Sequence, residues 1–291
     1  MNRRILIMAG GTGGHVFPAL AVAGNLRDHA VDVTWLGTQR GLESRVVPAA
    51  GYPMEWLSIR GVRRSGVLGW LLLPFRLLLA MFQAWRVIRR IRPDAVLAMG
   101  GFVSGPGGLV AWLARRPLLI HEQNAIAGLT NRWLALIADR VMCGFPGAFG
   151  ALPGVRHVGN PVRPEILALP LPAERMANRS GRLRVLVVGG SLGAEIFNKT
   201  VPQAIRTLSA AQRPEIWHQT GRGQRDATER AYEKSAVTTI VAEFIDDMAA
   251  AYGWADVVIC RAGAMTIAEL CAAGVAAILV PYPSAVDDHQ T

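Results

Sequence analysis

Short apolar runs alternate with longer segments of helical character along almost the whole chain. The runs are rich in Val, Ile and Leu, as the stretch at residues 183–188 illustrates. Strands of a parallel sheet need such continuous apolar runs, because helices cover both faces of the sheet. The alternation therefore predicts an α/β protein with parallel sheets. The predicted strands are Arg4–Ala9, Val31–Leu36, Ala95–Met99, Pro117–His121, Arg140–Cys143, Val155–Val158, Arg184–Val188, Glu215–Gln219, Thr239–Ala242, Asp256–Cys260 and Ala276–Pro281.

The two halves of the chain open in a similar way. Ile5–Gly14 and Val185–Ala194 each place an apolar strand before a double glycine, a hydroxyl residue and another glycine. The segment Asn160–Arg184 lies before the second of these strands, and its four prolines and many polar residues are typical of an interdomain linker. These features predict two doubly wound domains, residues 1–161 and 162–291, which face each other across a cleft.

Composition excludes several classes of protein. With 291 residues, 51% hydrophobic and 18% charged, the chain can build sizeable cores and is not a disordered chain. Three widely spaced cysteines exclude a disulfide framework, and the six scattered histidines form no HExxH motif.

Charge is distributed unevenly along the chain. Residues 1–150 hold 17 arginines against 7 acidic residues, a net charge of +10, whereas residues 151–291 are neutral overall. A basic half suits an anionic membrane or a nucleic acid, and the alternative is a solubilising surface. The arginines cluster with aliphatic residues rather than with stacking aromatic residues, which disfavours nucleic acid.

The segment Val67–Phe82 is apolar but does not predict a membrane span. It has 16 residues and contains Pro74 and Arg76, whereas a span needs about 20 mostly apolar residues. No acidic residue occurs between Glu55 and Asp94. The arginines in and around it are Arg60, Arg63, Arg64, Arg76, Arg86, Arg89, Arg90 and Arg92. This pattern favours a segment that lies on a membrane surface. The alternative is a buried helix with arginine stems along its edges.

Glycine-rich turns after predicted strands favour a phosphate-containing ligand, because backbone amides and a helix N-terminus can approach phosphate oxygens there. The turn Gly10–Gly14 lacks the third glycine of the dinucleotide fingerprint, since Val16 stands in its place. No GK[ST] triplet occurs, so NAD and ATP are disfavoured. His15 follows this turn and is a candidate general base, the alternative being a structural histidine.

Further polar loops follow other predicted strands. Gly100–Gly108 and His121–Asn124 do so in the first half, and Asn124 has helix capping as its alternative role. In the second half, the amides of Ala264–Thr266 open a helix and are placed to cap a diphosphate. Glu269, one turn later, could accept hydrogen bonds from the two hydroxyls of a ribose, and its alternative is an exposed helix residue.

Taken together, these segments resemble the family of bacterial peptidoglycan glycosyltransferases that add N-acetylglucosamine to undecaprenyl-linked muramyl-pentapeptide (lipid I) to form lipid II. The matching segments are GGTGGHVFPALAVA, MGGFVSGPGG, HEQNAIAGLTNR, VGNPVR, VVGGSLGA, EFIDDM, RAGAMTIAEL and DDHQT. The resemblance implies the GT-B architecture, with two Rossmann-like domains, the acceptor on the first and the donor on the second. It also implies that further residues of the second domain follow Thr291.

The resemblance implies a role for each matching residue. His15 is the implied catalytic base. The implied UDP-GlcNAc-binding residues are Thr12, Gly13, Gly14, Asn124, Arg163, Ser191, Ile245, Ala264, Met265, Thr266, Ile267, Ala268, Glu269 and Gln290. Among these, the backbone of Ile245 is expected to hold the uracil and Glu269 the ribose. Ser191 and Arg163 are expected at the phosphates or sugar, and Gln290 at the GlcNAc hydroxyls.

The implied partners are UDP-GlcNAc, lipid I, an anionic membrane surface and other cell-wall synthesis proteins, with no nucleic acid. We expect no cofactor and a metal-independent reaction. The acidic pair Asp287–Asp288 keeps metal binding as the alternative. The expected location is the cytoplasmic face of the bacterial plasma membrane, as a peripheral protein. Three alternatives remain at this point: another GT-B lipid glycosyltransferase, a UDP-GlcNAc 2-epimerase, and a non-catalytic scaffold that binds a nucleotide sugar.

Overall fold

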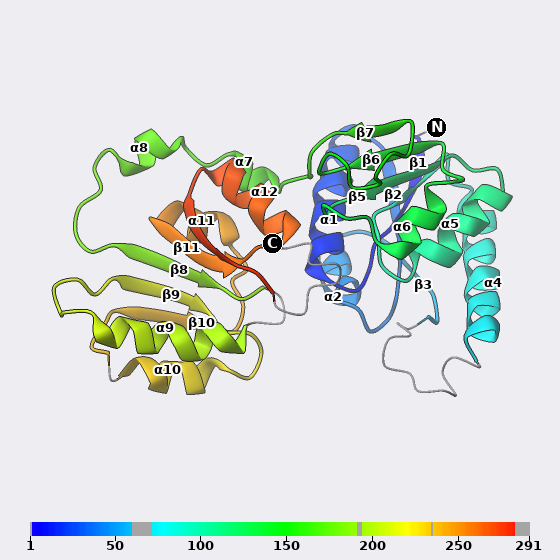
Figure 1. The fold of residues 1–291 in the computed structure, drawn as a ribbon. Coiled ribbons are helices and arrows are strands. Elements are labelled where there is room, and N and C mark those ends of the chain that lie inside the picture. The colour runs from blue at the N-terminus through cyan, green and yellow to red at the C-terminus, as the bar shows by residue number, and fades with distance from the viewer. Residues whose placement is uncertain (1, 60–71, 191–193, 234, 283–291) are drawn as a thin grey trace. The chain divides into compact units, whose positions relative to one another are not determined.

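The computed structural model describes residues 2–59, 72–190, 194–233 and 235–282. The chain divides into two compact units, Met1–Pro161 and Val162–Thr291 (Figure 1). The division falls between residues 161 and 162. Each unit contains one parallel β-sheet covered by helices on both faces. Both sheets match the α/β class predicted from the alternation of apolar runs.

Unit 1 is built on a seven-stranded sheet of order β3-β2-β1-β4-β5-β6-β7, with every neighbouring pair parallel. Its strands are β1 (Arg4–Met8), β2 (Asp32–Gly37), β3 (Met54–Trp56), β4 (Ala95–Ala98), β5 (Leu118–Glu122), β6 (Arg140–Cys143) and β7 (Val155–His157). Its described helices are α1 (Gly13–Asp28), α2 (Glu43–Ala49), α4 (Leu73–Ile91), α5 (Ser104–Leu113) and α6 (Leu129–Leu134).

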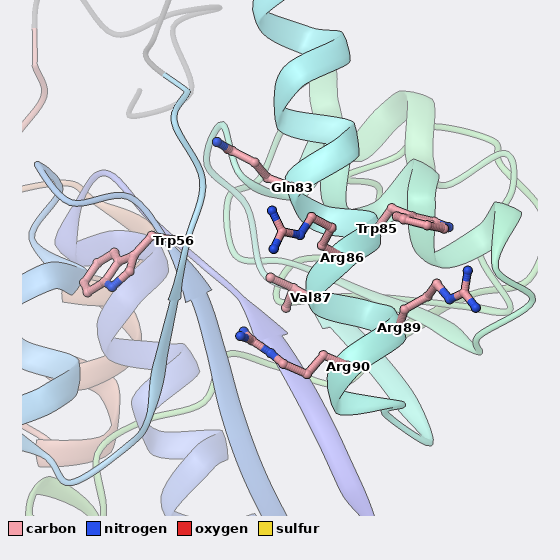
Figure 2. A pocket seen from close by; sticks show the side chains of 7 residues that line it. All are labelled: Trp56, Gln83, Trp85, Arg86, Val87, Arg89 and Arg90. Carbon is pink, nitrogen blue, oxygen red and sulfur yellow. The ribbon is translucent and has the colours of Figure 1, made fainter.

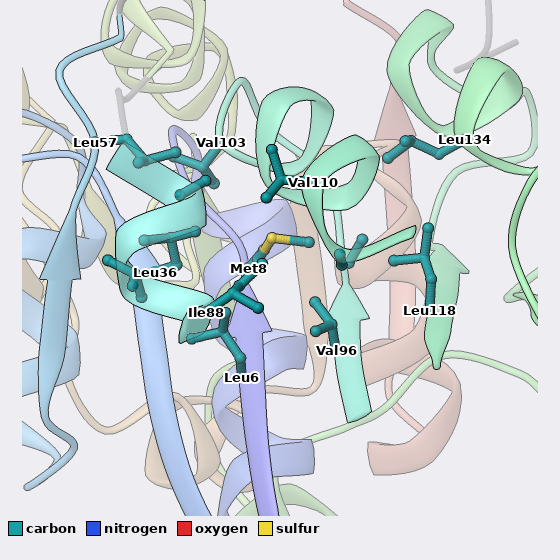
Figure 3. Packing of buried hydrophobic residues seen from close by; sticks show 14 of the residues in the cluster. Leu6, Met8, Leu36, Leu57, Ile88, Val96, Val103, Val110, Leu118 and Leu134 are labelled. Carbon is teal, nitrogen blue, oxygen red and sulfur yellow. The ribbon is translucent and has the colours of Figure 1, made fainter. Parts of the chain in front are cut away.

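Both faces of this sheet are buried, which explains the continuous apolar runs. Side chains of successive strand residues point to opposite faces. Leu6 and Met8 of β1 therefore join the core beneath α4 and α5, where Figure 3 shows them beside Ile88 and Val96. Ile7 belongs to the separate core on the opposite face.

Unit 2 has a five-stranded parallel sheet of order β10-β9-β8-β11-β12. Its strands are β8 (Arg184–Val188), β9 (Glu215–Gln219), β10 (Thr239–Ala242), β11 (Val257–Arg261) and β12 (Ala276–Val280). Its helices are α7 (Pro164–Leu167), α8 (Pro172–Met176), α9 (Glu195–Thr207), α10 (Arg225–Glu233), α11 (Met248–Trp254) and α12 (Ala264–Ala273).

Two sequence-based expectations need correction. The interpretation of Asn160–Arg184 as a linker is only partly right, because the segment contains α7 and α8 and buries Ile166 in the core of unit 2. The three-residue strand β3 was not predicted. It lies at the edge of the sheet, and such a short strand carries too little periodicity to be recognised.

The strand order locates a candidate site in each unit. In unit 1 the order reverses between β1 and β4, and in unit 2 between β8 and β11. Ligands of open parallel sheets bind beyond the carboxyl ends of the strands at such reversals. The turns that follow these four strands are the turns that the sequence marks with glycine.

Candidate functional site

The turn between β1 and α1 has the features of an anion-binding site. Gly11 adopts a φ of +93°, which glycine reaches without steric cost. Thr12 is the exposed N-cap of α1, and Gly13 and Gly14 supply the first backbone amides of this 16-residue helix. Amides in the first turn of a helix have no acceptor within the helix, so they are available to a phosphate oxygen.

A buried carboxylate supports this turn from beneath. Glu43 is fully buried and accepts hydrogen bonds from the Gly11 amide (2.9 Å), the Thr38 amide (2.9 Å) and the Thr38 hydroxyl (2.7 Å). A Cβ at Gly10 would lie 2.7 Å from Oε1 of Glu43, so a side chain there would displace the carboxylate. Sequence reasoning missed Glu43, because nothing in its local pattern indicates that it is buried.

His15 lies in the first turn of α1 and contacts residues that follow two other strands. Its Nδ1 lies 3.0 Å from Oε1 of Gln123, which is buried. A Cβ at Gly100 would lie 2.6 Å from the same nitrogen, and Gly100 has a φ of +103°. The imidazole is therefore held between the turn after β4 and the turn after β5, and it remains partly exposed.

Glu122 at the end of β5 fixes the position of Asn124. Its buried carboxylate accepts from the amide and side chain of Asn124 (3.0 and 2.9 Å), the amide of Gly128 (3.1 Å) and the side chain of Asn131 (2.9 Å). The N-cap of α6 is Gly128, so the alternative interpretation of Asn124 as a helix cap is wrong. Asn124 is half-buried, on a loop that these hydrogen bonds tie to Glu122.

In unit 2 the structure brings Arg163 and Glu269 together. Nε and Nη2 of Arg163 lie 3.1 and 2.9 Å from Oε1 of Glu269, and Tyr252 donates its hydroxyl to Oε2 at 3.1 Å. Burial, reinforced by the charge of Glu269, raises the pKa of the Tyr252 phenol, so this group stays protonated as a donor. Glu269 is only 8% exposed, so the alternative of an exposed helix residue is wrong.

The helix that carries Glu269 begins where the sequence places a diphosphate. Gly263 is the N-cap of α12, and Ala264–Thr266 form its first turn. The Ile267 amide is the first to bond back into the turn, to the Gly263 carbonyl at 2.9 Å. Ala268 follows it and is half-buried. Three amides therefore remain without a helical partner beside the reversal of strand order in unit 2.

Ile245 lies in the segment after β10 and is 4% exposed. Its side chain packs in the core with Leu186 and Met248. The segment is held by Asp247, which caps α11 by accepting from the Ala250 amide at 2.8 Å. An inward side chain on a fixed segment suits recognition of a base through the backbone.

The predicted site residues Ser191 and Gln290 lie outside the described residues, as do Asp287 and Asp288. The remaining predicted residues of unit 1 lie at the start of α1 and on the turn after β5, and those of unit 2 lie after β10, at the start of α7 and on α12. The supporting residues Glu43, His121, Gln123 and Tyr252 were not assigned roles from sequence.

One face of α4 is exposed and apolar. Its buried residues are Ala80, Ala84, Val87 and Ile88. Its exposed apolar residues, called here the α4 surface, are Phe75, Leu78, Leu79, Phe82 and Trp85, at 41–70% exposure. The alternative of a buried helix is therefore wrong for Leu72–Phe82, whereas residues 67–71 lie outside the described residues.

Arginines border the α4 surface. A cavity of about 490 Å³ is lined by Trp56, Gln83, Trp85, Arg86, Val87, Arg89 and Arg90 (Figure 2). The Arg89 guanidinium lies over the Trp85 ring, 4.9 Å from its centroid, and Arg90 pairs with Glu55. Apolar and cationic side chains thus occur side by side on one helix.

No helix among the described residues is both long enough and apolar enough to cross a bilayer. Across the same part of the chain, His, Cys, Asp and Glu side chains form no group of three that could hold a metal ion.

Two Rossmann-like parallel sheets, each with a glycine-marked turn at its strand reversal, are consistent with the GT-B architecture of glycosyltransferases. The N-terminal domain of glycosyltransferase family 28 matches residues 5–143, and the C-terminal domain of the same family matches residues 184–291. The chain therefore belongs to glycosyltransferase family 28, which confirms the family expected from the sequence motifs.

Curated relatives align with the whole chain. The UDP-N-acetylglucosamine--N-acetylmuramyl-(pentapeptide) pyrophosphoryl-undecaprenol N-acetylglucosamine transferase of Marinobacter nauticus is 56% identical, with 100% of this chain and 80% of the relative covered. The enzyme of the same name from Nitrosococcus oceani is 58% identical, with 100% and 81% covered.

Solved structures of other proteins show a similar fold. MurG of Acinetobacter baumannii superposes with a TM-score of 0.80 at 43% identity, covering 99% of this chain and 81% of that one. The UDP-GlcNAc 2-epimerase of Neisseria meningitidis has a TM-score of 0.65 at 11% identity, covering 95% and 82%, and this likeness shows the fold alone.

Proposed function

We propose that this chain transfers N-acetylglucosamine from UDP-GlcNAc to the 4-hydroxyl of the muramyl residue of undecaprenyl-pyrophosphoryl-MurNAc-pentapeptide, forming lipid II. The observation that carries the proposal is the identity of 56–58% along the whole chain with two transferases of that name. The UDP-GlcNAc 2-epimerase shares the fold at 11% identity, so it offers no comparable support for a different reaction.

Unit 2 binds the donor in this proposal. The backbone of Ile245 recognises the uracil, and Glu269 accepts a hydrogen bond from the ribose. Each carboxylate oxygen has two acceptor positions. Arg163 fills both positions on Oε1 and Tyr252 fills one on Oε2, so one position on Oε2 remains for a ribose hydroxyl. Ser191 and Gln290 are proposed to contact the phosphates and the sugar.

The diphosphate carries the charge that develops in the reaction. The N-terminus of α12, with the amides of Ala264–Thr266, offers hydrogen-bond donors and a favourable helix dipole for that charge. Arg163 adds a positive charge held in place by Glu269. These groups are fixed before the reaction, so they can stabilise the leaving group without a metal ion.

In unit 1, Thr12, Gly13, Gly14 and Asn124 are proposed to contact the sugar and diphosphate, and His15 is proposed as the base. Nε2 of His15 accepts the proton of the muramyl 4-hydroxyl. The oxygen then bonds to the anomeric carbon as the bond from that carbon to the UDP oxygen breaks, and the electron pair leaves with UDP. One such displacement on the α-linked donor gives a β-linkage.

The α4 surface is proposed to contact the membrane that holds the lipid-linked acceptor. Exposed apolar side chains flanked by arginines are typical of a helix that lies in the interface of a bilayer. Each arginine near an anionic surface contributes about 1 kcal/mol. The location proposed along with this contact is peripheral, on the cytoplasmic face of the bacterial plasma membrane, with other cell-wall synthesis proteins as proposed neighbours.

The product of the reaction tests the proposal. Incubation of the chain with UDP-GlcNAc and a lipid I analogue should give a β-1,4-linked disaccharide, identified by mass spectrometry and by the coupling constant of its anomeric proton. Free GlcNAc, an epimerised nucleotide sugar or an α-linked product would each reject the proposed reaction.

A further inference from the structure

A continuous line of hydrogen bonds runs behind His15 and through the interior of unit 1. Nδ1 of His15 lies 3.0 Å from Oε1 of Gln123. Nε2 of Gln123 lies 3.2 Å from Nδ1 of His121, and Nε2 of His121 lies 2.9 Å from the carbonyl oxygen of Gly159. Gln123 and His121 are 1% and 4% exposed, so water does not compete for these bonds.

The direction of each hydrogen bond in this line follows from the last acceptor, the carbonyl oxygen of Gly159. A carbonyl oxygen only accepts, so His121 carries its hydrogen on Nε2 and donates it to Gly159. Burial lowers the pKa of His121, which keeps the imidazole neutral with a single N–H. Nδ1 of His121 is therefore an acceptor, and it must accept from the amide nitrogen of Gln123.

The orientation of the Gln123 amide is fixed by a second bond. Its nitrogen also donates to the backbone carbonyl of His121 at 3.2 Å. A flipped amide would place Oε1 against that carbonyl, and two acceptors would face each other. Oε1 must then point at His15, where it can only accept, so Nδ1 of His15 carries a hydrogen. In neutral His15 the free electron pair is left on Nε2.

We propose that Gln123 and His121 are positioning residues that hold His15 in its Nδ1–H tautomer, so that Nε2 is the nitrogen that accepts the acceptor's proton. This inference rests on the proposed role of His15 as the base. It assigns to a neutral glutamine the orienting task that a carboxylate performs in many acid–base pairs.

The line ends on the last residues of unit 1. Gly159 accepts from His121, and the side chain of the next residue, Asn160, donates to the backbone carbonyl of Gln123 at 3.0 Å. Gly159 has a φ of +76°, a conformation that glycine adopts readily. The segment that leads out of unit 1 therefore holds Gln123 in two ways. Asn160 binds the main chain of Gln123, and Gly159 acts through His121 on the side chain of Gln123.

The tautomer itself can be observed. Free imidazole in histidine prefers hydrogen on Nε2, so an Nδ1–H tautomer would be a departure that the protein imposes. Long-range ¹H–¹⁵N correlation spectra of histidine-labelled protein distinguish the two forms, and the His15→Gln variant assigns the signal. We expect Nδ1–H for His15 in the wild-type chain. The Nε2–H form would overturn the proposal.

Gln123→Glu provides the functional test. A carboxylate beside Nδ1 favours the charged imidazolium, so the acidic limb of kcat against pH should move to higher pH by about one unit or more. The matched control is Gln203→Glu on the exposed side of α9, which adds the same charge elsewhere and should leave the limb in place. An unchanged limb in Gln123→Glu would contradict the proposal.

His121→Phe tests the other end of the line. The variant removes one of the two acceptors of the Gln123 amide nitrogen and keeps the other, the backbone carbonyl of residue 121. The amide is then held less firmly, and we expect a minor fraction of the Nε2–H tautomer of His15 and a fall in kcat of about 3-fold. UDP-GlcNAc affinity should stay within 2-fold, which also verifies that the variant is folded. If this variant does not fold, Gln123→Met carries the same expectation on tautomer and kcat.

The outcomes separate this inference from the proposed function. If His15→Ala retains normal turnover, the base role of His15 and the positioning role of Gln123 and His121 fail together, while the proposed transfer reaction stands. If His15→Ala loses turnover while Gln123→Glu and His121→Phe change neither the tautomer nor the pH profile, only the positioning role fails.

Discussion

Arg163 and Glu269 are 106 residues apart in the chain, yet two nitrogens of the guanidinium lie within 3.1 Å of one carboxylate oxygen. Arg163 is the N-cap of α7, and Glu269 lies in the second turn of α12. The pair is largely buried, and Tyr252 occupies the other oxygen. This contact joins two residues that the sequence marks separately as donor-binding and supports treating them as one site.

Glu269→Gln should weaken UDP-GlcNAc binding by about 10- to 100-fold, because hydrogen bonds to a charged group contribute about 1.5–3 kcal/mol. The amide keeps the size of the side chain but loses the charge and one acceptor oxygen. Isothermal titration with UDP-GlcNAc measures the effect. Glu165→Gln, an exposed neighbour of Arg163 on α7, is the matched control and should bind normally. Equal affinities for both variants would remove Glu269 from the donor site.

The α4 surface should bind anionic vesicles in a salt-dependent way. Replacing both Arg86 and Arg89 by Ser should weaken binding by about 2 kcal/mol, roughly 30-fold, at low ionic strength. Arg3→Ser, at an exposed arginine just before β1, is the control. Cosedimentation with vesicles of phosphatidylglycerol and phosphatidylcholine measures the loss. Binding that does not respond to salt would contradict the electrostatic contribution.

The apolar side chains of the α4 surface should contribute to vesicle binding separately from the arginines that border it. Phe75 is 70% exposed and Phe82 54% exposed. A Phe75→Ser, Phe82→Ser double variant should lose vesicle binding at high as well as low salt, since apolar burial is not screened by ions. Full binding by this variant would mean that the α4 surface does not enter the bilayer.

His218 should make the stability of the chain depend on pH. It is fully buried between Tyr232 and Asn198, and burial lowers its pKa to about 4. The unfolded chain, with an ordinary pKa near 6.5, binds more protons between these values. The contribution of neutral His218 to the free energy of unfolding should therefore be fully present above pH 6.5. The free energy of unfolding should fall by about 3 kcal/mol as the pH drops to 4.

Urea unfolding at several pH values measures this slope. A His218→Gln variant should lose the dependence that His218 contributes, although its stability at neutral pH will be lower. The exposed His29→Gln variant should keep the wild-type slope. Identical slopes in all three proteins would show that His218 does not titrate as its burial requires.

Removal of divalent metal should leave transfer intact. The proposed stabilisation of the leaving UDP comes from the N-terminus of α12 and from Arg163. The steady-state rate is therefore expected to be the same with and without excess chelator. Loss of the rate on chelation, and its return on adding Mg²⁺ or Mn²⁺, would require a metal in the mechanism.

Most of the sheet architecture was predictable because buried parallel strands leave continuous apolar runs. Four predicted strands coincide with observed ones, Arg140–Cys143, Arg184–Val188, Glu215–Gln219 and Thr239–Ala242, and the other predicted strands differ by one residue at one or both ends. The turns at the two strand reversals were also recognisable, since glycine is needed where the backbone has a positive φ or a close neighbour, as at Gly100.

The residues that hold the site could not be predicted in the same way. His15 and Gln123 are 108 residues apart, and only the order of strands brings their turns together. Glu43 is a charged residue on an ordinary helix, and its burial becomes apparent only when the neighbouring glycines are placed around it. Such contacts between distant segments leave no local periodicity in the sequence.

In the proposed reaction, UDP leaves the donor only when the lipid-linked acceptor attacks. The most direct measurement is the release of UDP from UDP-GlcNAc, with and without a lipid I analogue. We expect release that depends on the acceptor and that falls by about 100-fold or more in His15→Ala, while UDP-GlcNAc binding is retained. Release at the same rate without the acceptor, or no release from a chain that still binds UDP-GlcNAc, would contradict it.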